Sequence, residues 1–203
     1  MHPWVTQYDA GMDDYLIDRV PQALPAIEAE ARDAGFGMAS DRRAGALLRV
    51  LAASRPQGRF LELGTGCGLS AAWLLDGMDS GATLIPVDVE ETVSRIAGRH
   101  LGQDRRLTLV VAGAQAWLRS FRGAPFDLIF ADAMPGKYQH FDLAWGALSK
   151  GGIYVIDDML PQDNWPEGHA GQVEKLLRDL DSRTDCRLVR LSWSSGVVLA
   201  VRT

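Results

Sequence analysis

A glycine-rich turn between a predicted strand and a predicted helix constrains the fold of this chain most strongly. Gly64, Gly66 and Gly68 alternate with other residues after the apolar run 59–63, and a helical pattern begins at about Leu69. Alternating glycines permit a tight turn and let a ligand approach the main chain closely, and the first N–H groups of the helix are free to bind it. The turn predicts a cofactor site, although glycines that only shape a βα turn would give the same pattern.

The glycine spacing and the acid before it indicate which cofactor would fit. A dinucleotide fingerprint is G-x-G-x-x-G and receives a pyrophosphate at the helix N-terminus, whereas this chain has G-x-G-x-G. Glu62 stands two residues before Gly64, and its carboxylate would repel a phosphate but attract an ammonium or a sulfonium group. S-adenosylmethionine carries both of these groups, so the pattern favours it over a nicotinamide dinucleotide.

Composition and charge indicate one enzyme-sized domain. Of the 203 residues, 47% are hydrophobic, and the formal net charge is −5 without a long basic run, which argues against a nucleic-acid partner. Cys67 and Cys186 are the two cysteines; they cannot form a disulfide framework and fit a reducing cytoplasm. No window approaches the ~18 apolar residues of a membrane span, and no signal peptide is recognised, so we expect no membrane partner.

Strand-like and helix-like patterns alternate along most of the chain. Continuous apolar runs, typical of buried parallel strands, are separated by helical spacings such as the face from Phe141 to Leu148, and a hairpin closes the chain. The predicted strands are 59–63, 83–88, 107–112, 126–131, 152–157, 187–192 and 197–202. We therefore predict a Rossmann-like three-layer α/β sandwich, with a seven-stranded, mostly parallel sheet and an antiparallel C-terminal hairpin.

An all-helical segment precedes this core. The chain is interpreted as a single domain, with an N-terminal helical cover over residues 1–54 and a cofactor-binding α/β core over residues 59–203. Pro21 and Pro25 should split or kink the first helical pattern of the cover. Ser40 is predicted to be the N-cap of the helix that follows.

Polar residues that follow the second and third predicted strands are candidates for the site, because ligands of open α/β sheets bind at the carboxyl ends of the strands. Asp88 ends the second strand, where a carboxylate can accept both hydroxyls of a ribose. An acid that only complements the dipole of the next helix is the alternative. Gly113, Ala114 and Gln115 follow the third strand and could line an adenine slot.

Carboxylates also follow the fourth and fifth predicted strands. Asp132 follows the fourth, and Asp157 and Asp158 follow the fifth, so three like charges should meet at one edge of the sheet, which is unfavourable unless a proton or a cation intervenes. Oxygen ligands of this kind suit Mg²⁺, Mn²⁺ or Ca²⁺ rather than zinc. Residue type alone leaves a second interpretation open, in which Asp158 caps a turn and Asp132 orients a loop.

Taken together, these stretches resemble the class I S-adenosylmethionine-dependent methyltransferases, and more narrowly the catechol and caffeoyl-CoA O-methyltransferase group. The similarity rests on the glycine run, on Asp88, and on the stretches FDLIFAD at 126–132 and GGIYVIDD at 151–158. It extends from about Met38 to Leu160. It implies methyl transfer from S-adenosylmethionine to a hydroxyl oxygen of a small molecule, assisted by a divalent metal ion such as Mg²⁺.

The resemblance also implies roles for single residues. For the cofactor it implies Met38, Ser40, Glu62, Gly64, Gly66, Gly68, Ser70, Asp88, Gly113, Ala114, Gln115 and Asp132. It implies that Asp132, Asp157 and Asp158 are the metal ligands, and Asp158 departs from the asparagine that this group usually has there.

The catalytic lysine of the group is displaced in this chain. The group places it three residues after the first metal-binding acid, where this chain has Pro135. Lys137 stands five residues after Asp132 and directly before Tyr138, which matches an aromatic residue of the family. The resemblance therefore makes Lys137 and Asp132 the candidate catalytic residues, and a solvated surface lysine is the alternative for Lys137.

The acceptor is expected to be a small molecule, with phenols as one class. Trp165, His169 and Trp193 are predicted to border its pocket, and packing contacts are the alternative for each of them. Trp4 and Tyr8 could cover the site from the N-terminal segment. Metal-independent methylation of an oxygen or a nitrogen atom is the alternative function, and a non-catalytic or nicotinamide-binding protein is a remoter one. The resemblance makes a homodimer the expected assembly.

Overall fold

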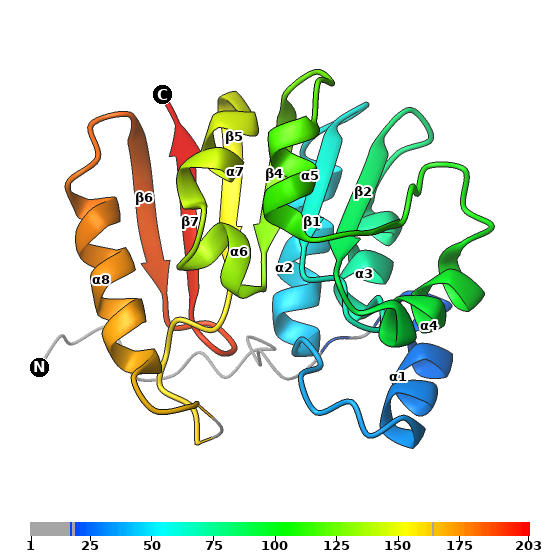
Figure 1. Cartoon of the computed structure of the whole chain (residues 1–203). Helices are drawn as coiled ribbons and strands as arrows, with labels where there is room; N and C mark the ends of the chain where they lie inside the picture. The colour runs from blue at the N-terminus through cyan, green and yellow to red at the C-terminus, as the bar shows by residue number, and fades with distance from the viewer. Residues whose placement is uncertain (1–16, 18, 164) are drawn as a thin grey trace, which may run out of the picture.

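The structure, a computed structural model, describes residue 17 and the ranges 19–163 and 165–203. Its centre is a seven-stranded sheet in the order β3-β2-β1-β4-β5-β7-β6 (Figure 1). β1 to β5 pair in parallel, whereas β7 is antiparallel to both β5 and β6. The strands are β1 (Arg59–Leu63), β2 (Thr83–Asp88), β3 (Val110–Val111), β4 (Phe126–Ala131), β5 (Leu148–Ile156), β6 (Cys186–Leu191) and β7 (Val197–Arg202).

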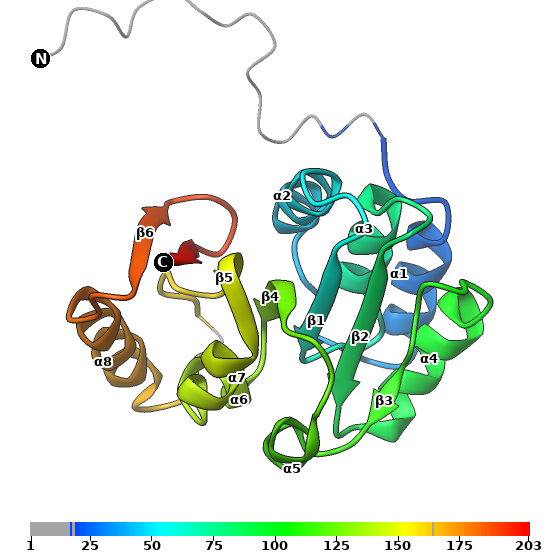
Figure 2. The same ribbon diagram turned by 90° about the horizontal axis from the view of Figure 1, so that it is seen from above.

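Helices cover both faces of the sheet and complete three layers. The view from above in Figure 2 shows α1 to α4 on one face of the sheet and α5 to α8 on the other. The first group is α1 (Leu24–Asp33), α2 (Arg42–Ala53), α3 (Leu69–Gly77) and α4 (Glu91–Leu101). The second is α5 (Ala114–Ser120), α6 (Met134–Lys137), α7 (Phe141–Ala147) and α8 (His169–Asp181). The predicted Rossmann-like sandwich with its C-terminal hairpin is confirmed.

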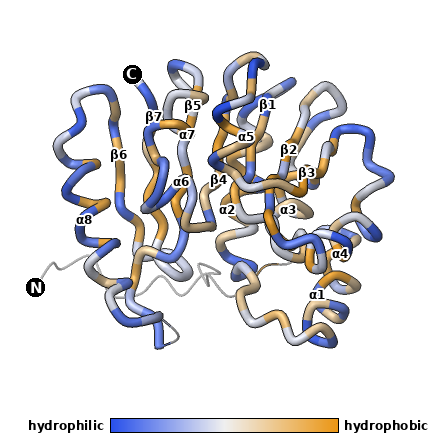
Figure 3. The backbone as a smooth tube through the Cα atoms, viewed as in Figure 1, coloured by the Kyte–Doolittle hydropathy of each residue, from blue (hydrophilic) through white to orange (hydrophobic). Residues whose placement is uncertain are grey.

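The hydrophobic core has two parts, one on each face of the sheet. Successive strand residues point to opposite faces, so Phe60 packs under α1 to α4 while its neighbour Leu61 packs under α5, α7 and α8. Figure 3 shows this as hydrophobic colour along the inner strands, with hydrophilic colour on the outer turns of α8. None of the helices that the structure describes has the length and hydrophobicity of a membrane-spanning segment.

Most strand boundaries agree with the sequence prediction, and the edge strand β3 is the main exception. Only Val110 and Val111 pair with β2, apart from an isolated bridge at Leu107, although the prediction was 107–112. The backbone groups of Leu84 and Asp88 form hydrogen bonds on the side of β3. Because alternate residues of a strand bond to the same neighbour, the backbone of Pro86 points to that side as well. Proline has no N–H to donate, which interrupts the ladder at that point.

Two further predictions were wrong at the ends of elements. Leu148 was predicted on the face of α7, but it is the first residue of β5. Ser40 was predicted to cap α2, but the N-cap is Asp41, whose carboxylate accepts a hydrogen bond from the Arg43 N–H at 2.6 Å. The Ser40 hydroxyl instead donates to Asp132 at 3.1 Å. α1 begins after Pro21, as that proline predicted, whereas Pro25 lies in the first turn of the helix and does not split it.

Candidate functional site

The glycine turn after β1 has a backbone that only glycine adopts without strain. Gly64, Gly66 and Gly68 have φ values of 95°, 51° and 91°, in the left-handed region that costs other residues free energy. A Cβ on Gly64 would also lie 2.8 Å from the Asp132 carbonyl oxygen. The turn therefore brings the ends of β1 and β4 into close contact, and Gly68 is the N-cap of α3.

Glu62 lies beneath this turn as a buried carboxylate without a hydrogen-bond partner. The residue is fully buried, and neither oxygen receives a hydrogen bond from the described residues. Its pKa is raised to about 8, mainly by burial and in addition by charge repulsion from Asp132 and Asp88, although nearby Ser70 opposes the shift. An unpaired buried carboxylate is costly, so the site favours a ligand that brings a cation to Glu62.

Asp88 holds the glycine turn in place. Its two carboxylate oxygens accept hydrogen bonds from the N–H groups of Gly66 at 2.8 Å and Glu90 at 2.9 Å. These bonds leave further lone pairs on both oxygens, so binding of a ribose by Asp88 stays a prediction. Glu90, two residues later, also faces the cavity below, which the sequence analysis did not single out.

A cavity of about 200 Å³ lies between the glycine turn and the segment that joins α1 to α2. Of the predicted cofactor residues it is lined by Met38, Ser40, Gly64, Gly66, Ser70, Asp88 and Asp132. Glu62 and Gly68 lie behind this lining, and Gly113, Ala114 and Gln115 do not reach it, so an adenine wall at 113–115 stays a prediction. Phe36, whose ring would lie 2.7 Å from a Cβ on Gly66, was missed; its only signal is an aromatic residue between Gly35 and Gly37.

A second cavity of about 560 Å³ lies beside the first. Trp165 and His169, which were predicted to border the acceptor pocket, both line it, and its use for the acceptor stays a prediction. Their rings are 4.5 Å apart, and His169 Nε2 lies 3.1 Å from the hydroxyl of Tyr138. Trp193 does not line this cavity; its indole N–H donates to the Arg43 carbonyl and so ties the β6–β7 turn to α2. Trp4 and Tyr8 lie outside the described residues.

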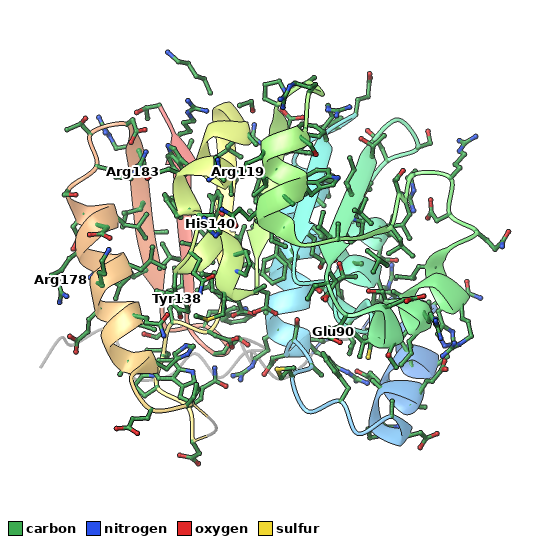
Figure 4. The ribbon with its side chains drawn as sticks, viewed as in Figure 1. Glu90, Arg119, Tyr138, His140, Arg178 and Arg183 are labelled. Carbon is green, nitrogen blue, oxygen red and sulfur yellow. The ribbon has the colours of Figure 1, made fainter. Side chains whose placement is uncertain are left out.

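Three residues, Asp132, Ser40 and Met38, line both cavities. The junction between the cavities therefore contains a carboxylate and a hydroxyl that are hydrogen-bonded to each other. Figure 4 shows Glu90 and Tyr138 on the two sides of this region, at the edge of the sheet where the parallel strands end.

The three predicted acids meet at this junction. One carboxylate oxygen from each of Asp132, Asp157 and Asp158 lies within 4.8 Å of the others. Burial raises the pKa of Asp132 to about 8 and also raises that of Asp157. Asp158 differs: burial would raise its pKa, but Lys137 and then Gln162 outweigh this, so its pKa is lowered.

Lys137 is buried against these acids. Its ammonium lies 3.3 Å from Asp132 Oδ1 and 3.6 Å from Asp158 Oδ2, and the residue is 4% exposed. Gly136, with φ of 91°, turns the chain before it, and its carbonyl accepts a hydrogen bond from the Tyr154 hydroxyl at 2.7 Å. Burial alone would lower the pKa of Lys137, but the attraction of Asp132 and Asp158 outweighs it and raises the pKa. The solvated-lysine alternative is therefore wrong.

The three carboxylates favour binding of a metal ion, whereas the nearby Lys137 ammonium opposes it. Three carboxylate oxygens suit a hard divalent cation. However, the oxygens Asp132 Oδ1 and Asp158 Oδ2 already face the Lys137 ammonium, and a cation bound between them would lie next to a like charge. A divalent cation therefore does not fit between Asp132 and Asp158 while Lys137 holds this position.

The raised pKa values predict how stability depends on pH. Glu62 and Asp132 have ordinary values of 4.5 and 3.8, which rise to about 8 in the folded state. The folded state therefore binds more protons than the unfolded state up to about pH 8, so stability falls as pH rises through this window. We expect the free energy of unfolding, measured by urea titration, to decrease from pH 6.5 to pH 8.5, and Glu62→Gln to remove part of the decrease. A constant free energy in both proteins would contradict the assigned burial of these charges.

Comparison with known proteins finds a family match over the segment that carries the site. Residues 61–159, which include the glycine turn and all three acids, match the family model described as a methyltransferase domain. A protein of Mycolicibacterium vanbaalenii named "Putative O-methyltransferase" is 38% identical over 122 residues, or 58% of this chain and 54% of that protein. The chain thus matches about half the length of this relative.

Solved structures share the fold of this chain over nearly its whole length. The O-methyltransferase TomG from Streptomyces achromogenes, in complex with SAM, has a TM-score of 0.79 at 24% identity, covering 94% of this chain and 93% of TomG. An O-methyltransferase from Bacillus cereus, in complex with SAH, has a TM-score of 0.81 at 18% identity and covers 94% of each chain. At these identities the likeness shows the fold.

Proposed function

We propose that this chain is a S-adenosylmethionine-dependent methyltransferase that acts on a hydroxyl oxygen of a small molecule. The observation that carries the proposal is the position of Asp132, which lines both the cavity at the glycine turn and the larger cavity beside it. A residue at this junction can contact the methyl donor and the acceptor together. The names of the curated relative and of the solved structures support the same activity.

The residues at the glycine turn fit the cofactor. When bound, S-adenosylmethionine supplies an electrophilic methyl group on a sulfonium. Glu62 offers an unpaired buried carboxylate for the ammonium of the methionine part, and the open backbone of Gly64 and Gly66 permits close approach. Asp88 and Glu90 offer carboxylates beyond the turn for the ribose hydroxyls. These charges would repel a pyrophosphate, which argues against a dinucleotide.

Asp132 is the candidate proton acceptor. Methyl transfer to an R–OH forms the O–CH₃ bond, breaks the S–CH₃ bond and releases the hydroxyl proton. A general base works best when its pKa lies near the working pH, and that of Asp132 is about 8. Ser40 donates to Asp132 Oδ2 and orients the carboxylate. Lys137 does not line the acceptor cavity and its pKa is raised, so it is poorly placed to accept this proton.

The acceptor cavity favours a planar, hydroxylated molecule such as a phenol. Trp165 offers an aromatic face beside His169, and aromatic rings stack well on such faces. A homodimer remains the assembly expected from the family resemblance. A reducing cytoplasm fits Cys67 and Cys186, which are both buried and unbridged.

The proposal is tested by binding and by turnover. We expect calorimetry to show binding of S-adenosylmethionine and none of NAD⁺. We expect a panel of phenols and other small hydroxylated molecules to include at least one that yields S-adenosylhomocysteine and the methyl ether. Binding of NAD⁺ instead of S-adenosylmethionine would overturn the proposal, and cofactor binding with methylation only of amines would reassign the acceptor atom.

A further inference from the structure

Lys137 approaches the three acids from a different side than the acceptor does. Asp132, Asp157 and Asp158 all line the acceptor cavity, whereas Lys137 does not. Lys137 lines a separate cavity of about 640 Å³, which is bordered by α7 and α8. Its ammonium therefore contacts Asp132 and Asp158, although Lys137 lines neither the cavity at the glycine turn nor the larger cavity beside it.

The backbone on both sides holds this contact in place. Tyr154 anchors Gly136 directly before Lys137. Asp158 has φ of 58°, a left-handed conformation that aspartate adopts more readily than most residues. The side-chain amide of Gln162 donates to Asp158 Oδ1 at 2.8 Å, which leaves Oδ2 toward the ammonium. Two independent loops thus position the ammonium and its second carboxylate partner.

We propose that the Lys137 ammonium is the resident cation of this acidic cluster, so that the site works without a bound divalent metal ion. The proposal deepens the proposed function, and its claim about activity rests on that function. Three carboxylates at one junction repel one another unless a proton or a cation intervenes, and a buried ammonium 3.3 Å and 3.6 Å from two of them supplies a cation. Lys137 is then a positioning residue, which holds Asp132 Oδ1 and leaves Asp132 Oδ2 with Ser40 at the junction of the cavities.

Binding of Mn²⁺, followed by electron paramagnetic resonance, tests the proposal without any acceptor. We expect the unchanged protein to bind Mn²⁺ weakly, with a dissociation constant above the millimolar range. Lys137→Met removes the ammonium and keeps the volume of the stem, so its affinity for Mn²⁺ should be about tenfold higher or more. Lys150→Met, the same change at an exposed lysine of β5, should bind Mn²⁺ as the unchanged protein does.

Stability supplies a readout that does not depend on Mn²⁺. Lys137→Met leaves buried carboxylates unpaired and should lower the thermal unfolding midpoint, and adding Asp158→Asn should restore part of the loss because it removes one of those charges. If Lys137→Met does not fold, Mn²⁺ binding by the unchanged protein and by the double variant Lys137→Met with Asp158→Asn still tests the proposal.

Two results would overturn the proposal. One is stoichiometric, micromolar binding of Mn²⁺ by the unchanged protein, together with loss of turnover in excess chelator. The other is a Lys137→Met variant that folds and binds Mn²⁺ no more tightly. Failure of the proposed function is recognised separately, because it would appear as absent binding of S-adenosylmethionine while these Mn²⁺ measurements remain valid.

Discussion

Replacement of Asp132 by asparagine is expected to lower kcat by about 10²–10⁴-fold, the usual contribution of a general base. The amide has nearly the same shape and can still accept the Ser40 hydrogen bond, but it cannot take the proton of the acceptor hydroxyl. Binding of S-adenosylmethionine should change little, because Asp132 is the base in this proposal and Glu62 holds the ammonium. The measurement is single-turnover formation of S-adenosylhomocysteine with an acceptor found in the panel above.

The thermal unfolding midpoint distinguishes a catalytic role of Asp132 from a structural one. Burial raises the pKa of Asp132 despite the nearby Lys137 ammonium, and the amide oxygen can still accept a hydrogen bond, so its replacement should change the unfolding midpoint little. Asp33→Asn, at the exposed end of α1, is the matched control and should change neither rate nor stability. Full activity in Asp132→Asn would assign the proton to another acceptor and contradict the mechanism.

Replacement of Glu62 by glutamine is expected to weaken binding of S-adenosylmethionine by about 10- to 100-fold. A charge-assisted hydrogen bond contributes about 1.5–3 kcal/mol, and the amide retains the shape of the carboxylate without its charge. The free protein should become more stable above pH 8, because the variant no longer buries an unpaired carboxylate. Calorimetric titration gives the affinity, and urea unfolding gives the stability.

The control for Glu62 is Glu174→Gln, the same change at a residue on α8 whose side chain is 71% exposed. It should leave both the affinity and the stability unchanged. If Glu62→Gln binds the cofactor as tightly as the unchanged protein, the carboxylate does not hold the ammonium, and its burial serves only the packing beneath the turn.

Local patterns predicted the framework of this protein because each depends on neighbouring residues only. The runs at 59–63, 83–88, 126–131 and 197–202 coincide with β1, β2, β4 and β7, since continuous apolar residues have few alternatives to a buried strand. The glycine turn was predicted for the same reason: three left-handed conformations in five residues leave little choice but glycine. The apolar run at 107–112 could not show that its pairing with β2 is interrupted at Pro86, because strand pairing depends on a distant segment.

The sequence by itself determined the layered α/β fold, the glycine turn after β1 and the acids that follow β4 and β5, because strand ends and turns are local properties. Only the tertiary structure decided what those acids contact. Lys137 is five residues from Asp132 but twenty-one from Asp158, and its burial between them depends on Gly136, Tyr154 and the left-handed backbone of Asp158. The same is true of Ser40, which a local pattern places at a helix cap and the fold places on Asp132. The charges of a buried site come from segments that are distant in the sequence, so their contacts depend on the tertiary structure.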